Sequence, residues 1–162
     1  MAIEKLTLIP LPFVSANKKY RSAGFYLLDM NFLGIGKRMF IGGRYSSYGW
    51  RSNAGIFSSQ SGPSKIMWSL YTEVSDFKYE NAKADGTVYE SFHSFYQRYR
   101  YAAGYKLNRI VAVLNTGEYR AADVYDRHNG NTDTMRDSHT ITQGVLFRVD
   151  TMASNQFFMQ GL

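Results

Sequence analysis

The chain lacks several features on which common classes of protein depend. Its 162 residues include no cysteine, which excludes disulfide bonds and thiolate chemistry. No stretch approaches the roughly 20 apolar residues of a membrane-spanning helix, so the chain could enter a membrane only as a β-barrel. The formal net charge is +6, but there is no basic run and no usual nucleic-acid-binding motif. Nucleic acid is therefore not an expected partner.

The motifs of the common enzyme classes are absent as well. The Gly-x-Ser-x-Gly, Walker and dinucleotide-binding patterns do not occur, and the three histidines (His93, His128 and His139) include no pair at metal-ligand spacing. His93 and Ser94 are adjacent, which places their side chains on opposite faces of a strand and argues against a catalytic dyad. We expect Asp137-Ser138-His139 to belong to a loop. The sequence thus predicts no enzyme activity, no cofactor and no metal site.

The sequence is instead rich in aromatic residues, with 13 Tyr and 11 Phe, which favour strands. Side chains alternate with a period of two between Ile66 and Val74, where the even positions are mostly apolar. The alternation from Phe92 to Leu107 covers about sixteen residues, compared with roughly five or six in an ordinary strand. This length suits a tilted strand that crosses a bilayer. Arg98 and Arg100 fall on the face opposite Tyr99, Tyr101 and Tyr105, where they would point into a polar lumen.

The remaining predicted strands are less regular, and turn residues separate them. They are Lys5–Val14, Tyr20–Leu33, Lys37–Tyr48, Arg51–Ser59, Arg109–Tyr119 and His139–Thr151. Long connections are predicted at Lys78–Glu90 and Asp123–Ser138. Short turns on one side and long loops on the other are typical of outer-membrane barrels. The expected fold is all-β: one domain over residues 1–162, an antiparallel transmembrane β-barrel of about eight strands.

Two prolines, Pro10 and Pro12, lie in the first predicted strand, and neither can donate a hydrogen bond to a neighbouring strand. This predicts an edge position. A second interpretation is a seam, where the barrel closes imperfectly or pairs with another chain.

The segment from Gly24 to Arg38 resembles the early barrel hairpin of the BamA and TamA outer-membrane assembly superfamily, also called the Omp-eighty-five superfamily. That family has an aromatic-rich strand, then Asn-x-x-Gly-x-Gly followed by Lys or Arg, then a strand with alternating apolar residues. The matching hairpin residues here are Asn31, Gly34, Gly36 and Lys37. Glycines suit such a tight hairpin because a positive φ costs nothing without a Cβ. The resemblance implies a small member that matches the N-terminal half of the family barrel.

The departures from the family pattern shape the functional expectation. Family barrels have sixteen strands and are preceded by periplasmic POTRA domains, whereas this chain has room for about eight strands and no POTRA domain. Half a barrel can close alone, or two chains can pair into a composite barrel. We expect a homo-oligomer, a dimer or larger, in the outer membrane of a Gram-negative bacterium, with a structural or membrane-organising role that involves lipid. Residues 1–5 lack the pattern of a secretory signal, so an exported form would be the mature chain.

Four aromatic residues are candidates for an interfacial girdle: Trp68, Tyr99, Tyr101 and Tyr105. Ordinary sheet packing is the other interpretation of these residues. The alternative to the membrane barrel as a whole is a soluble, lipocalin-like barrel that binds a small hydrophobic ligand. Lumen polarity distinguishes the two, because the arginines point inward in a membrane barrel and outward in a soluble one.

Overall fold

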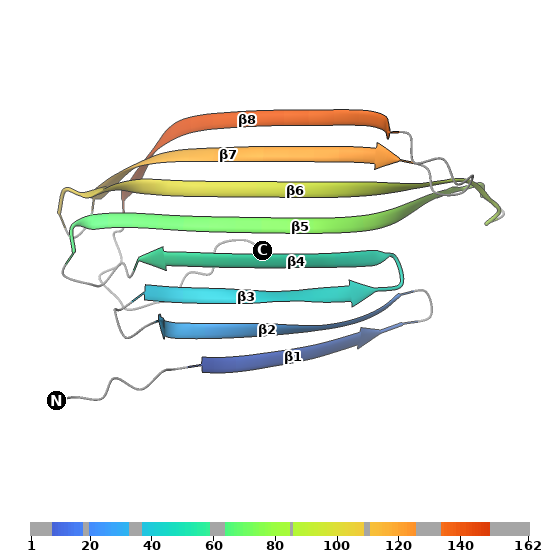
Figure 1. The fold of residues 1–162 in the computed structure, drawn as a ribbon, viewed down its shortest axis with the longest axis horizontal. Helices are drawn as coiled ribbons and strands as arrows, with labels where there is room; N and C mark the ends of the chain where they lie inside the picture. Colours follow the sequence, from blue (N-terminus) through green and yellow to red (C-terminus); the bar gives the residue numbers. More distant parts are fainter. Residues whose placement is uncertain are drawn as a thin grey trace.

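The computed structural model describes residues 8–17, 20–32, 37–58, 64–84, 86–108, 111–125 and 134–149. These residues form one sheet of eight antiparallel strands in sequence order, with β1 and β8 at opposite ends of the sheet (Figure 1). The strands are β1 (Leu8–Ala16), β2 (Arg21–Phe32), β3 (Lys37–Ser46), β4 (Gly49–Ser58), β5 (Ile66–Ala82), β6 (Val88–Lys106), β7 (Val111–Tyr125) and β8 (Thr134–Val149). The described part of the chain holds no helix long and apolar enough to cross a membrane.

The predicted all-β class and the eight antiparallel strands are confirmed, but the strand bounds differ in the second half of the chain. The long connection predicted at Lys78–Glu90 is wrong, because β5 continues to Ala82 and β6 begins at Val88. Lys78 pairs with His93 in this stretch, within an unbroken ladder. Lys78 and Glu80 lie on one face there and the stacked rings of Tyr79 and Phe92 on the other, so the polar and apolar sides of the alternation are exchanged while the backbone remains paired.

The connection predicted at Asp123–Ser138 is also shorter than expected. β7 runs to Tyr125 and β8 begins at Thr134, so Asp137 and Ser138 lie in a strand and not in a loop, as does His139, which pairs with Ala121. His128 lies outside the described residues.

The turn between β3 and β4 depends on a glycine. Gly49 has a φ of 141°, which L side chains rarely adopt. A Cβ at Gly49 would also lie 2.0 Å from the carbonyl oxygen of Asp76 on the neighbouring strand. This contact makes Gly49 necessary for the close approach of the turn to β5.

The sheet is open, and its two edges differ. The Asn17 N–H donates to the Tyr20 carbonyl at 2.8 Å, so the odd-numbered residues of β1 bond to β2 and the even-numbered ones face the free edge. Pro10 and Pro12 are even-numbered, and their missing N–H groups therefore fall on that free edge. The edge position predicted for the two prolines is confirmed within the described sheet.

The β8 edge carries no proline. The Leu107 N–H donates to the Val111 carbonyl at 2.9 Å, which assigns the odd-numbered residues of β7 to β6 and the even-numbered ones to β8. By the paired register, the odd-numbered residues of β8 direct their N–H and C=O groups outward. The sixteen-residue β8 thus presents a longer edge than the nine-residue β1, and no proline removes an N–H donor from it.

Candidate functional site

The register divides the side chains between two faces of opposite character, because paired residues in an antiparallel sheet share a face. The apolar face carries Val14, Phe25, Leu27, Ile41, Tyr45, Trp50, Ile56, Ile66, Trp68, Leu70, Tyr99, Tyr101, Tyr105, Ile141, Val145, Phe147 and Val149. The polar face carries Arg38, Arg44, Arg51, Asn53, Glu73, Ser75, Arg98, Arg100, Lys106, Glu118, Arg120, Thr140, Thr142 and Arg148.

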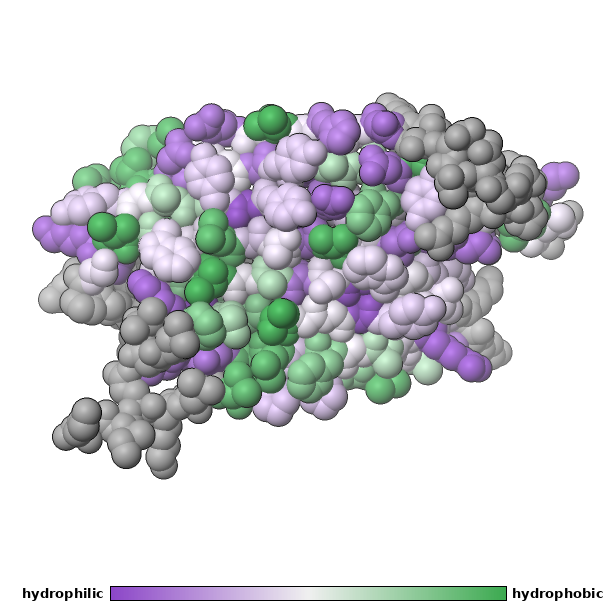
Figure 2. Space-filling view, in the orientation of Figure 1, coloured by the Kyte–Doolittle hydropathy of each residue, from purple (hydrophilic) through white to green (hydrophobic). Residues whose placement is uncertain are grey.

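Burial on the two faces is the reverse of that in a soluble sheet. Ile141 and Phe147 on the apolar face are 82% and 70% exposed, whereas Glu73 and Asn53 on the polar face are 7% and 4% exposed. Hydrophobic side chains are spread over the visible surface from the β1 side to the β8 side (Figure 2). The polar face therefore shelters its two glutamates, together with the apolar cluster of Met67, Ala112 and Leu114, while the apolar face leaves many large hydrophobic side chains exposed.

The exposed apolar residues form a band that slants across the strands. At one boundary, Trp50 on β4 is paired with Asp76 on β5, and the same row reaches Asp123 on β7. At the other boundary, Lys37 ends the band on β3, while β8 stays apolar as far as Val149. Both boundaries are thus displaced in the same direction from β3 towards β8. A band that is level in a membrane has this slant when the strands are tilted.

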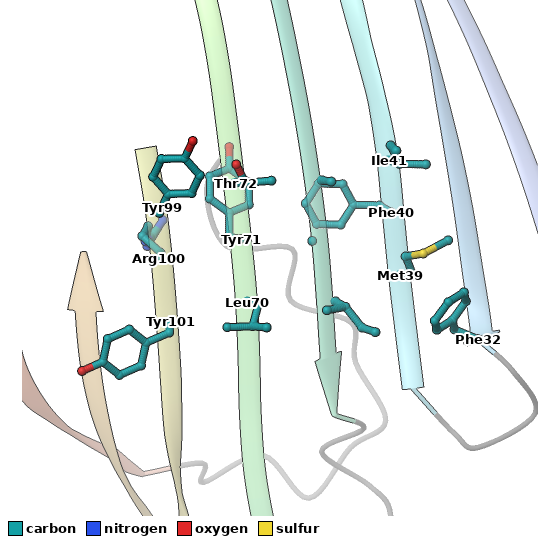
Figure 3. A pocket seen from close by; sticks show the side chains of 13 residues that line it. Phe32, Met39, Phe40, Ile41, Leu70, Tyr71, Thr72, Tyr99, Arg100 and Tyr101 are labelled. Atoms are coloured by element: carbon teal, nitrogen blue, oxygen red, sulfur yellow. The ribbon is translucent and has the colours of Figure 1, made fainter. Parts of the chain in front are cut away.

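The four girdle candidates all lie on the apolar face, on β5 and β6. The hydroxyl of Tyr101 donates to the Oδ1 of Asn115 at 2.9 Å. Between these aromatics and β3 is a shallow groove of about 580 Å³ (Figure 3). Its labelled lining includes Phe32, Met39, Ile41, Leu70, Thr72, Tyr99 and Tyr101. The groove is a depression in the apolar face and not an enclosed cavity.

The polar face contains an ion-pair network on β6 and β7. Glu118 contacts Arg98 at 2.9 Å and Arg100 at 3.2 Å, and it also pairs with Arg120. Its side chain is only 14% exposed. One carboxylate thus forms ion pairs with three guanidinium groups.

A second pair lies on the neighbouring strands. Glu73 contacts the Nε of Arg51 at 3.2 Å and accepts a hydrogen bond from the Tyr71 hydroxyl at 2.6 Å. The guanidinium groups of Arg44 and Arg51 lie over the ring of Phe77, at 6.0 and 5.6 Å from its centroid. The arginine side chains on this face therefore interact both with carboxylates and with aromatic rings.

The predicted lumen residues Arg98 and Arg100 both belong to this polar face, next to Glu118. Of the hairpin motif, Asn31 and Lys37 lie near the facing ends of β2 and β3, whereas Gly34 and Gly36 are outside the described residues. Asp29, two residues before Asn31 in the same segment, is 2% exposed and accepts a hydrogen bond from the Asn31 N–H at 2.9 Å. This bond lies in the irregular stretch between Asp29 and Phe32.

A polar cluster that sequence reasoning missed lies beyond the apolar band. The Nδ1 of His93 is 3.2 Å from the Oδ1 of Asp76, whose Oδ2 accepts a hydrogen bond from the Tyr125 hydroxyl at 2.8 Å. The rings of His93 and Tyr125 are stacked at 5.6 Å. Only the register of β5, β6 and β7 brings these residues together. The described residues hold no group of His, Cys, Asp and Glu that could bind a metal ion.

Comparisons of the chain with protein-family models, curated proteins and solved structures give no match. The class that the structure itself defines is an all-β protein with one open antiparallel sheet of eight strands.

Proposed function

We propose that this chain is a membrane-spanning β-barrel protein of the bacterial outer membrane, with a structural or membrane-organising role. The observation that carries the proposal is the reversed distribution of polarity: the sheltered face holds Glu73 and Glu118, and the exposed face holds Leu70 and Ile141. In water this arrangement exposes a large apolar surface. In a bilayer the same surface contacts acyl chains, and the polar face is the inside of the barrel.

Strand length supports the proposal. A tilted β-strand crosses the hydrocarbon core in about 9 to 11 residues. β1, β3 and β4 have 9, 10 and 10 residues, and the apolar alternation of β5 runs from Ile66 to Val74. Nine residues correspond to about 26 Å along a strand, or about 20 Å along the membrane normal at a tilt of about 40°, slightly less than the band of roughly 25 Å on outer-membrane barrels.

The lipocalin-like alternative requires an apolar interior that holds a hydrophobic ligand. The sheltered face carries Arg98, Glu118 and Glu73 instead, and the groove of about 580 Å³ lies on the exposed face. The distribution of charge therefore favours the membrane barrel over the soluble one.

We further propose that a second copy completes the barrel, as the resemblance to half of a sixteen-strand barrel implied. Figure 1 shows β1 and β8 at opposite ends of an open sheet, and these two strands run antiparallel. If both copies have the same orientation in the membrane, β8 of each copy meets β1 of the other. Because Pro10 and Pro12 remove two donors from the β1 edge, this junction is a weak seam.

Membrane insertion can be tested with the two tryptophans, since Trp50 and Trp68 both lie on the apolar face. The refolded protein is placed in vesicles that contain brominated acyl chains, and its tryptophan fluorescence is recorded. Strong quenching is expected. The matched control replaces Trp50 and Trp68 by Phe and introduces Tyr71→Trp on the polar face, where quenching should be weak. Equal quenching from both faces, or none from the apolar face, would contradict the proposal.

The seam can be tested by chemical cross-linking, because the chain has no cysteine. Val14→Cys on β1 and Val145→Cys on β8 are made as separate variants, mixed, refolded and treated with a flexible bis-maleimide. A composite barrel gives cross-linked heterodimers. A barrel that closes alone gives only an internal cross-link in the double variant, and native mass in mild detergent then shows a monomer.

A further inference from the structure

The polar face has a large excess of positive charge. Its described basic side chains are Arg38, Arg44, Arg51, Arg98, Arg100, Lys106, Arg120 and Arg148. Its described acidic side chains are Glu73 and Glu118. The acidic side chains Asp29, Asp76, Asp123 and Asp137 fall on the other side of the sheet by the register; Asp29 pairs with Met39 within the apolar band, and the other three lie beyond the band.

We propose that this face lines a water-filled passage that admits small inorganic anions in preference to cations. The inference rests on the proposed membrane barrel and extends it to what passes through the lumen. Fixed charge of one sign between walls of low dielectric constant raises the local concentration of the opposite ion. Rings of Arg and Lys side chains are the usual basis of anion selectivity in pores.

The ion pairs on this face leave much of the positive charge uncompensated. Glu118 is shared by Arg98, Arg100 and Arg120, so three cationic groups meet one carboxylate. Arg44 has no carboxylate partner within the described strands, and its buried Nε has no hydrogen-bond acceptor there. A solvated anion would accept hydrogen bonds from the guanidinium groups of these arginines.

The packing of the aromatic side chains keeps the lining of the passage thin. A Cβ at Gly55 would lie 2.4 Å from the ring of Phe40, and one at Gly24 would lie 2.2 Å from the ring of Phe13. These rings therefore lie across glycines of the neighbouring strand and do not project from the sheet. The guanidinium group of Arg44 lies over Phe77 in the same way. A composite barrel of sixteen strands lined like this encloses a channel, because barrels of 16 to 18 strands retain an aqueous lumen.

The test is the reversal potential of the refolded full chain in planar phosphatidylcholine bilayers under a potassium chloride gradient. We expect chloride to be favoured over potassium by roughly tenfold. The variant with Arg44→Glu, Arg100→Glu and Arg120→Glu has equal numbers of described basic and acidic side chains on the polar face, and its selectivity should disappear. The milder set with Gln at the same positions should give an intermediate selectivity.

The matched control places the same three charge reversals on the other face, as Arg21→Glu, Lys37→Glu and Lys78→Glu. It should retain the anion preference. Tryptophan quenching by brominated lipid is recorded on the same samples. A chain that is quenched but gives a cation-selective current, or no current, overturns the anion passage and leaves the membrane barrel standing. A chain that is not quenched contradicts the membrane barrel itself.

Discussion

The two halves of the sheet differ in strand length, and in the proposed membrane barrel this difference separates the part suited to the membrane from the part that would extend beyond it. Strands β1 to β4 have 9, 12, 10 and 10 residues, whereas β5 to β8 have 17, 19, 15 and 16. On β5 the extra length lies beyond Phe77, which pairs with Gly49 at the β3–β4 turn. β5 and β6 therefore form an extension past the short half at this end of the sheet, whereas β7 ends and β8 begins level with Lys78, and their extra length lies at the opposite end.

The extension has a different chemistry from the band. His93 and Tyr125 lie on its outer side and contact Asp76 at its boundary with the band, and Lys78 forms an ion pair with Glu80. Charges on the lipid side of a strand are most destabilising at the middle of the hydrocarbon core and cost little near its boundaries. The extension would therefore stand in water, at the end of the sheet opposite the start of β1 and the end of β8.

The largest expected change in stability comes from placing a charge in the apolar band. The same substitution in the extension, on the same side of the sheet, is the comparison. Leu70→Arg places a charge in the middle of the apolar band and should lower the free energy of unfolding in lipid vesicles by about 2 to 4 kcal/mol. Ser91→Arg, on the same side but in the extension, should change it by less than about 0.5 kcal/mol. Urea titration of both variants in vesicles measures the difference, and equal effects would remove the distinction.

The second prediction compares carboxylates in the two parts of the long half. Glu118→Gln removes the counter-charge of three arginines and should destabilise the protein by about 1.5 to 3 kcal/mol. Glu80→Gln in the extension removes one exposed pair with Lys78 and should cost about 0 to 1 kcal/mol. If chloride binds on the polar face, a high chloride concentration should reduce the loss of unfolding free energy caused by Glu118→Gln. The same measurement in a sulfonate salt of equal ionic strength separates chloride binding from general screening.

The third prediction compares the turns of the two halves. Gly49→Ala combines a positive φ with a Cβ that meets the Asp76 carbonyl, and it should cost about 1 to 3 kcal/mol. Gly86 in the β5–β6 connection has a φ of 86° but nothing within 4 Å of an added Cβ. Gly86→Ala should therefore cost only about 1 kcal/mol. A larger loss at Gly86, measured by the same urea titration, would show that the extension contributes to stability.

The sequence predicted the band better than it predicted the extension. Alternation between Ile66 and Val74 identified the strand and its two faces, because one face is apolar and the other is polar. Beyond Asp76 the face that was apolar becomes polar, with Lys78 and Glu80, while Phe77 and Tyr79 lie on the other face. The alternation therefore changes its sense there, and Lys78–Glu90 was interpreted as a loop. The partners of Glu118 could not be predicted either, since they depend on the register between β6 and β7.

The smallest expected effect comes from removing the extension. Tyr79 and Phe92 are directly paired, and their rings stack at 5.4 Å, so residues 80–91 can be replaced by an Asn-Gly turn that joins these two positions. Because the deleted residues lie outside the apolar band, the change in unfolding free energy in vesicles should be no more than about 0.5 kcal/mol. Tryptophan quenching by brominated lipid should stay at the level of the unmodified chain. Loss of insertion would show that the long hairpin takes part in assembly in the membrane. The extension could then no longer be treated as separate from the part of the sheet that inserts.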